Sequence, residues 1–286
     1  MRLANIVVLC VALLVAGIFL TRWIYMGNTT VEINEFVILS DRLPEEFEGF
    51  KIAQISDLHD AEFGENNQKL VSVVEGINAD IIVITGDIID SRRLDVAKAL
   101  SLAERLVTIA PVYYVNGNNE SKVKTAYEKL KQGLIGMGVN VLENSSENIE
   151  VEGKCITIAG ISDPKFDPNL YPGIPKRLVN LHLEAIPDNE NFKILLAHRP
   201  EYINRYAGKA DLVFSGHAHG GQFIFPLIGG ILAPGQGLFP KYYGGLYKYG
   251  TTDMLVSRGL GNSSFPFRFN NKPVVVVAQL KRRKNT

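Results

Sequence analysis

Metal-binding side chains follow five short apolar segments of this sequence of 286 residues. Each segment is rich in valine and isoleucine and runs directly into a polar turn. Imidazole, carboxylate and amide groups without thiolates suit Mn, Fe, Zn, Co or Ni, and they do not distinguish among these metals. The sequence therefore predicts a divalent metal centre. Its candidate ligands are Asp57, His59, Asp87, Asn118, His198, His217 and His219.

The positions of the histidines give the strongest support for this prediction. A single histidine at a strand end is more often an ordinary hydrogen-bonded residue than a ligand. Four of the five histidines in the chain, however, follow a predicted strand. Asp57-x-His59 and His217-x-His219 also suit a shared ligand, because alternate residues of an extended chain point the same way. The joint pattern favours metal binding over incidental placement.

The elements that must position these residues are short and rich in valine and isoleucine, which is typical of strands buried on both faces. Ligands of an open α/β sheet bind at the carboxyl ends of its strands. Helical patterns lie between the early strands, and a strand-rich half follows, which predicts a layered α/β sandwich with a single domain after residue 30. The expected strands are 51–55, 81–85, 112–115, 156–159, 193–197, 212–214, 254–257 and 274–279, and the expected helices are 67–77, 94–109 and 122–137.

The N-terminal segment differs in kind from the rest. Residues 4–20 contain no charged side chain, and Trp23 and Tyr25 follow at the position of a membrane interface. A cleaved signal peptide is the alternative, but its apolar region is usually shorter. We expect a single-pass cell-membrane anchor over 1–27, a connecting segment over 28–48 and the catalytic domain over 49–286. Arg2 and the α-amino group favour a cytoplasmic N-terminus and hence an extracytoplasmic domain.

Composition narrows the function. Thirty basic residues balance thirty acidic ones, so no overall field attracts nucleic acid. The two cysteines form no CxxC pair. The neutral overall charge and the predicted membrane anchor disfavour a nuclease, and a nucleic-acid partner is not expected.

Together these motifs resemble the calcineurin-like metallophosphoesterases, over about residues 51–273. The resemblance implies a layered α/β/β/α sandwich and hydrolysis of phosphoric ester or pyrophosphate bonds. Residues 217–222 and 257–261 are similar to the N-terminally membrane-anchored branch of the family, including enzymes like the UDP-2,3-diacylglucosamine pyrophosphatases of lipid A biosynthesis. The matching blocks are Asp57-x-His59, Gly86-Asp87, Gly117-Asn118, His198 and Gly216-His217-x-His219.

The resemblance also implies a ligand set for two divalent ions. A water between the ions would be the nucleophile, and the ions would stabilise the attacking and leaving oxygens. Asp87 would bridge the ions. One ion would be held by Asp57, His59, Asp87 and His219, and the other by Asp87, Asn118, His198 and His217.

One position departs from the family pattern. Asn119 stands where the family usually has a histidine that contacts the phosphate and protonates the leaving oxygen. An amide can donate a hydrogen bond to the substrate but cannot transfer a proton at neutral pH. Loss of a general acid typically costs about 10²–10⁴ in rate. We therefore expect a good leaving group, another acid or slow turnover, with a catalytically weakened metal-binding scaffold as the alternative.

Two further features concern the substrate. Arg199 and Arg258 are candidates for binding its phosphate, and surface ion pairs are the alternative for both. The apolar, glycine-rich segment 223–249 is either a rim near the metals that receives a lipid tail or a loop folded over the core. We expect a phosphorylated small molecule or a lipid-linked, membrane-proximal substrate. A narrower expectation is the lipid A pyrophosphatase reaction, which requires a cytoplasmic site; preference between phosphomonoesterase and phosphodiesterase activity stays open.

Overall fold

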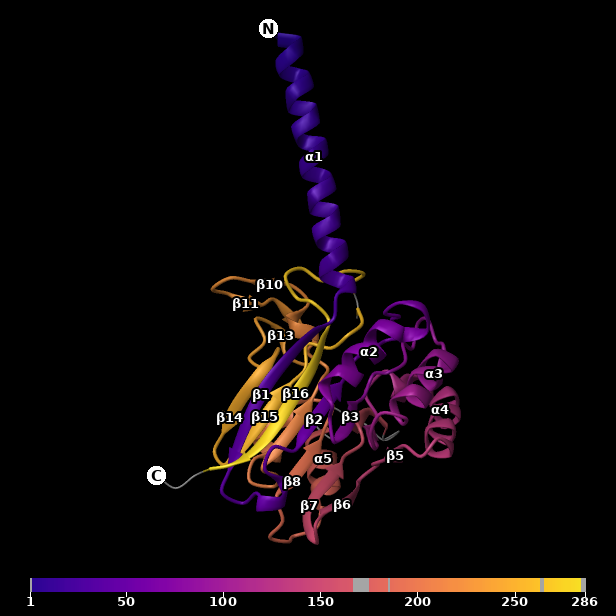
Figure 1. The fold of residues 1–286 in the computed structure, drawn as a ribbon, viewed down its shortest axis with the longest axis vertical. Helices are drawn as coiled ribbons and strands as arrows, with labels where there is room; N and C mark the ends of the chain where they lie inside the picture. Colours follow the sequence, from indigo (N-terminus) through magenta and orange to yellow (C-terminus); the bar gives the residue numbers. More distant parts are fainter. Residues whose placement is uncertain (1, 167–174, 185, 263–264, 284–286) are drawn as a thin grey trace.

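A long N-terminal helix projects from the domain in the computed structural model, which describes residues 2–166, 175–184, 186–262 and 265–283 (Figure 1). This helix, α1 (Arg2–Thr29), has exposed side chains along most of its length. Its segment Leu3–Thr29 has a mean hydropathy of 2.9 and is long and apolar enough to cross a membrane. Because almost none of its apolar surface packs on protein, a lipid environment would account for it.

Two six-stranded sheets form the centre of the domain (Figure 1). The first has the order β1–β16–β2–β3–β4–β5, with β1 (Glu32–Ser40), β16 (Val274–Arg282), β2 (Lys51–Ile55), β3 (Ile81–Thr85), β4 (Val112–Val115) and β5 (Asn140–Val141). The second has the order β14–β15–β9–β8–β7–β6, with β14 (Gly245–Tyr249), β15 (Thr252–Val256), β9 (Leu212–Ser215), β8 (Lys193–Leu196), β7 (Lys154–Gly160) and β6 (Ser145–Val151).

Strand direction brings the predicted ligands to one edge of each sheet. In the first sheet β2, β3, β4 and β5 are parallel neighbours. In the second sheet β7, β8, β9 and β15 are parallel neighbours. At least one predicted ligand follows the carboxyl end of each of five strands, namely β2, β3, β4, β8 and β9.

Helices cover the two outer faces, which gives the layer order α/β/β/α and confirms the expected fold. The first sheet is covered by α2 (Gln68–Ile77), α3 (Val96–Leu106) and α4 (Lys124–Gly136), and the second by α5 (Pro175–Glu184) and α6 (Ile203–Tyr206). Side chains along β3 point alternately to the core under the helices and to the core between the two sheets. Ile82 and Ile84 of β3 pack toward the helices, whereas Ile81 and Val83 pack between the sheets.

The segment expected to connect anchor and domain contains a full strand of the first sheet. All nine residues of β1 pair in parallel with β16. β1 therefore belongs to the sheet, and only Thr30 and Val31 separate it from α1.

The remaining elements are short. Two small antiparallel pairs, β10 (Ile224–Phe225) with β11 (Gly229–Gly230) and β12 (Leu232–Ala233) with β13 (Gly237–Leu238), organise the apolar segment after the last histidine. Single turns of 3-10 helix occur at Glu45–Phe47, Glu65–Asn67, Glu120–Lys122, Pro164–Phe166, Pro200–Tyr202 and His219–Gly221.

Candidate metal centre

Four of the predicted ligands form one buried cluster. Asp57, His59, Asp87 and His219 each offer a ligand atom, and these atoms all lie within 4.8 Å of one another. The Nε2 atoms of His59 and His219 are 3.0 Å apart, and His219 Nε2 is 3.3 Å from Asp57 Oδ1. Two imidazoles and two carboxylates that converge on one point are a ligand set for a divalent ion.

A second cluster shares Asp87 with the first. Asp87, His198 and His217 also offer ligand atoms within 4.8 Å of one another. His198 Nε2 is 3.5 Å from Asp87 Oδ2, while its Nδ1 lies 2.7 Å from the carbonyl oxygen of Thr85. That carbonyl is an acceptor for the Nδ1 proton, which leaves Nε2 available to a metal. The shared carboxylate makes a dinuclear centre possible.

Asn118 provides an independent test of this assignment. Its side chain is buried, yet within the described part of the chain its Oδ1 has no hydrogen-bond partner. A buried amide oxygen without a donor costs about 1–3 kcal/mol unless something else satisfies it. A divalent ion bound beside Asp87 would satisfy it. The residues present therefore fit two metal ions.

The backbone of the ligands is unusual as well. Asp57, His59, Asp87, His217 and His219 all have φ between 49° and 66°. Left-handed backbone is uncommon for residues other than glycine, although Asp, Asn and His tolerate it best. Such conformations cluster at functional sites because the surrounding structure enforces them. Here they turn the chain sharply at strand ends and aim side chains at the shared edge.

Glu120 holds two ligand loops together, and the sequence reasoning assigned it no role. Its buried carboxylate accepts the backbone N–H groups of Asp87 at 3.0 Å, Gly117 at 2.9 Å and Ile88 at 2.8 Å. Burial, reinforced by the charge of nearby Asp87, raises the pKa of Glu120 to about 8. Its position two residues after Asn118 was visible in the sequence, but the three backbone donors become apparent only in the fold.

Asp57 is fixed in a similar way. Ser56 Oγ donates to Asp57 Oδ2 at 2.6 Å, and the backbone N–H of His217 lies 3.0 Å from the same oxygen. Gly216 must be glycine at this crossing, because a methyl group added there would clash with Ser56 Oγ and with Asp57 Oδ2. The close approach connects the β2 loop with the β9 loop across the two sheets.

Arg199 lies beside the second cluster. Its Nε donates to Asp163 Oδ2 at 2.6 Å, and its NH1 lies 3.2 Å from Glu201 Oε1 and 3.0 Å from His217 Nε2. The guanidinium is buried, and these carboxylates hold it against the metal ligands. Arg199 is thus in a buried ion pair next to the centre, and its contact with a substrate phosphate stays a prediction.

Asn119 faces the bridging carboxylate. Its backbone N–H donates to Asp87 Oδ1 at 2.7 Å, and its side-chain amide donates to Asp87 Oδ2 at 2.6 Å. Ser91 Oγ donates to Asn119 Oδ1 at 2.8 Å. In the described structure this amide therefore orients Asp87, and a contact with substrate stays a prediction.

Arg258 points in another direction. It forms an ion pair with Glu32 of β1 at 2.9 Å and lines a pocket at the base of α1. The structure contains the ion pair expected as the alternative for Arg258, and contact of Arg258 with a substrate phosphate stays a prediction.

Burial sets the protonation of most of the histidines. It lowers the pKa values of His59, His217 and His219, which favours the neutral form that metals require. Burial would also lower the pKa of His198, but Asp87 beside it dominates and raises the value to about 10. The same pairing holds the pKa of Asp87 well below its usual range despite burial. A bound metal ion would supply the positive charge beside Asp87 in place of a protonated His198.

Comparisons with known proteins agree with the site. Residues 50–221 match the family described as calcineurin-like phosphoesterase. The chain is 30% identical over 265 residues to an uncharacterized metallophosphoesterase of Bacillus subtilis, YkuE, covering 90% of this chain and 88% of that protein. It is 29% identical over 290 residues to a zebrafish protein named as a transmembrane protein with metallophosphoesterase domain. That alignment covers 95% of this chain and 62% of the zebrafish protein.

A solved structure, that of the protein TT1561 from Thermus thermophilus, shares the fold with a TM-score of 0.50 and 14% identity. The match covers 74% of this chain and 90% of that one. At this identity the likeness concerns the fold alone. The family match and the Bacillus relative go further, and this chain belongs to the calcineurin-like phosphoesterases, which are hydrolases acting on phosphoester bonds.

Proposed function

We propose that the protein hydrolyses a phosphoric ester or pyrophosphate bond of a lipid-linked, membrane-proximal substrate at a dinuclear metal centre. The observation that carries the lipid-linked part is the position of the apolar segment. Gly235, at the turn between β12 and β13, lies so close to the centre that an added methyl group would be 3.5 Å from His217 Nε2. The apolar segment and a metal ligand are therefore neighbours.

This segment presents apolar side chains to solvent beside the site. Leu238 is 67% exposed and Phe239 is 65% exposed, whereas Ala233 of the same hairpin is buried. One side of the hairpin thus packs on the core and the other stays open. Exposed apolar groups next to a phosphate-binding centre suit a substrate with both a phosphate and a hydrocarbon part.

The same surface continues to the base of the anchor. The rings of Trp23 and Phe269 are 5.0 Å apart, and Phe269 stacks on Phe225 of β10 at 5.3 Å. Figure 1 shows the β10–β11 hairpin near the lower end of α1. With α1 in a bilayer, the apolar surface would face the membrane and receive a substrate from it.

The chemistry divides between the ions and the chain. When bound, two divalent ions would activate a water and neutralise charge on the phosphoryl oxygens. Asp87 would join the two metal sites, and Asn119 would keep its carboxylate oriented through two hydrogen bonds. Arg199 would place positive charge beside the second site, with Asp163 fixing its orientation.

The position of the domain relative to the membrane separates two versions of this proposal. A single-pass anchor with basic groups at Arg2 predicts an extracytoplasmic domain. Hydrolysis of UDP-2,3-diacylglucosamine requires a cytoplasmic one. We therefore propose the broader class, lipid-linked phosphates, and treat the nucleotide-sugar lipid as one substrate to be tested.

Paired substrates test the lipid-linked class. The full chain in detergent micelles with Mn²⁺ is assayed on a nitrophenyl phosphodiester, on a phosphate ester carrying a long acyl chain, and on its short-chain counterpart with the same headgroup. We expect a higher kcat/KM for the ester with the long acyl chain than for its short-chain counterpart. Leu238→Ser and Phe239→Ser should together reduce that preference at least tenfold, since tenfold corresponds to about 1.4 kcal/mol and full burial of one apolar side chain contributes about 1.5–3 kcal/mol.

Ile135→Ser serves as the control because Ile135 is exposed on α4, in the outer helical layer. It should leave the preference unchanged. Equal kcat/KM for both chain lengths in the unmodified protein would contradict a lipid-linked substrate. Two bound metals with no turnover of any substrate would instead favour the scaffold alternative.

A further inference from the structure

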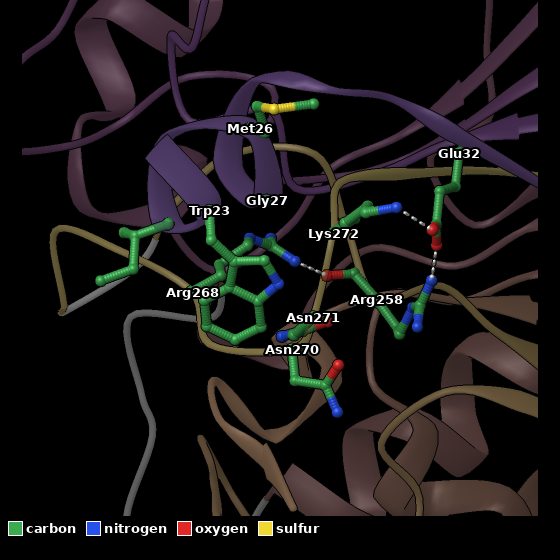
Figure 2. A pocket seen from close by; sticks show the side chains of 10 residues that line it. Trp23, Met26, Gly27, Glu32, Arg258, Arg268, Asn270, Asn271 and Lys272 are labelled. Carbon is green, nitrogen blue, oxygen red and sulfur yellow. Dashed lines mark hydrogen bonds and ion pairs between the residues drawn. The ribbon is translucent and has the colours of Figure 1, made fainter. Parts of the chain in front are cut away.

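A pocket of about 370 Å³ lies where the anchor meets the domain (Figure 2). One wall is the last part of α1, with Trp23, Ile24 and Met26. The opposite wall belongs to the chain between β15 and β16. Its lining there consists of Arg258, Arg268, Asn270, Asn271 and Lys272, with Glu32 of β1 at one side.

The pocket has more positive than negative charge. Arg258 and Lys272 each lie 2.9 Å from the carboxylate of Glu32, which is the one acidic residue among the described lining residues. Arg268 has no carboxylate partner in the described structure. Its terminal nitrogens donate to the carbonyl oxygens of Arg258 and Gly261. Three cations against one anion leave a net positive site.

Two guanidinium donors in this lining are unused. The Nε–H groups of Arg268 and Arg258 are buried, and neither has a hydrogen-bond partner among the described residues. Arg268 itself is only 2% exposed. A buried charged group with an unsatisfied donor is costly, and a phosphate oxygen is the acceptor that best matches a guanidinium.

The position of the pocket at the membrane end of the domain indicates that its phosphate ligand belongs to a lipid. Tryptophan is enriched at the level of lipid headgroups, and Trp23 stands at the end of the apolar span that enters the domain. Ile24 and Met26 on the same wall are apolar. A ligand in this pocket would have its anionic group against the cations and its hydrocarbon part along α1.

We propose that this pocket binds the headgroup phosphate of an anionic phospholipid from the leaflet next to the domain. The proposal rests on the membrane anchoring by α1 that forms part of the proposed function. It assigns a role to Arg258 and Lys272 that is separate from hydrolysis. Glu32 occupies these two cations when no lipid is bound, and the phosphate displaces part of that pairing.

This lipid site shares a wall with the metal centre. Arg268 NH2 lies 3.5 Å from His219 Nδ1, and Asn271 Nδ2 donates to the backbone carbonyl of His219 at 2.8 Å. The residues that line the pocket thus support a metal ligand from behind. A lipid bound here would hold the catalytic edge at the membrane surface.

Trp23 offers a direct readout because it is the chain's only tryptophan. The full-length protein is placed in phosphatidylcholine nanodiscs with increasing mole fractions of phosphatidylglycerol, and its tryptophan emission is recorded. We expect a saturable change with phosphatidylglycerol and none in phosphatidylcholine alone. Glycerol 3-phosphate added to neutral nanodiscs tests a soluble phosphate as the source, and it should leave the emission unchanged.

Substitutions in the lining should act in opposite directions. Lys272→Gln removes a half-exposed cation and should raise the half-saturating mole fraction about tenfold, the effect of one charge-assisted hydrogen bond. Glu32→Gln removes the competing carboxylate and should lower that fraction. Arg22→Gln is the matched control, because Arg22 carries the same charge on α1 but lies outside the pocket lining. It should change the fraction at most about fivefold, the effect of general surface attraction on one basic residue.

The outcomes separate this inference from the proposed function. Equal effects of Lys272→Gln and Arg22→Gln would mean that the lipid is attracted only by unspecific surface charge, and this result would overturn the proposal. Saturation by glycerol 3-phosphate would overturn the lipid as its ligand. Hydrolysis of the nitrophenyl ester is measured on the same nanodisc samples, and flotation with neutral vesicles is measured on the same protein preparation. Normal flotation and hydrolysis without a tryptophan response would reject the lipid site and leave the hydrolase intact.

Discussion

Asn119 donates two hydrogen bonds to Asp87, one from its backbone N–H at 2.7 Å and one from its side-chain amide at 2.6 Å. The residue at the position of the family's usual histidine is therefore tied to the carboxylate that both ligand clusters share. An amide in this place orients a ligand and supplies no proton to a leaving group.

Leaving-group basicity should therefore control the rate. A nitrophenyl ester, whose leaving group is stable as an anion, should be cleaved much faster than an alkyl ester of the same phosphate. Asn119→His should accelerate the alkyl ester about tenfold or more and the nitrophenyl ester far less, because a general acid helps poor leaving groups most. Steady-state kinetics on both esters measure this difference.

Ser91→Ala is the control for Asn119→His. It removes the hydroxyl that donates to Asn119 Oδ1 without adding a proton donor. The hydrolysis rates of both esters should therefore change by the same factor. Equal acceleration of the two esters by Asn119→His would mean that this position acts on phosphate binding. No acceleration of either would mean that another group already acts as the acid.

Metal content should follow the ligand assignment. Asn118→Ala should lower the metal content from about two ions per chain toward one, because only the second site uses Asn118, and Asp87→Asn should weaken both sites. Elemental analysis of purified protein gives the stoichiometry. Asn148→Ala on β6, which removes the same side chain far from the ligands, should keep the full content. Unchanged content in both site variants would reject the ligand set.

Removal of residues 1–27 should yield a soluble, active domain, since all of β1 remains. This truncation also keeps Asn28, whose side chain donates to the carbonyl oxygen of Arg268 at 3.1 Å and accepts the N–H of Arg268 at 2.7 Å. Removal of residues 1–29 should lower the melting temperature further, because both hydrogen bonds are lost. Aggregation or metal loss in the shorter truncation would show that α1 is a structural part of the domain.

The buried pair of Arg199 and Asp163 should contribute far more to stability than an exposed pair. Asp163→Ala leaves the Arg199 guanidinium buried without its main partner and should cost about 3–5 kcal/mol of unfolding free energy. Glu45→Ala breaks the exposed pair with Arg282 and should cost at most about 1 kcal/mol. Urea unfolding of the full chain in detergent compares the two. Similar costs would contradict the structural role given to Asp163.

The sequence predicts the part of this fold that depends on local patterns. Short, mostly apolar segments locate β2, β3 and β4 at their observed bounds, because a strand buried on both faces lacks the regular alternation of polar and apolar residues. The ligand residues were predictable for the same reason, since polar side chains at the ends of such strands have few structural explanations. The α/β/β/α layers followed from the family resemblance.

Contacts between distant parts of the chain were not predictable. Asp163 meets Arg199 across 36 residues, and Asn28 meets Arg268 across 240 residues. A charged or amide side chain has no periodicity that identifies its partner. The apolar segment 223–249 left two alternatives open for a related reason. In the structure Ala233 and Tyr242 pack on the core while Leu238 and Phe239 stay exposed, and the role of the exposed part in receiving a lipid tail stays a proposal.

A dinuclear centre whose two metal sites share Asp87 is tested most directly by a titration of metal-depleted protein with Mn²⁺. Hydrolysis of the nitrophenyl phosphodiester and bound metal are measured together at each step. We predict no hydrolysis without metal, full activity at about two ions per chain and loss of that activity in Asp87→Asn. Equal hydrolysis by the metal-depleted protein, or full activity in Asp87→Asn, would contradict a hydrolase of this kind.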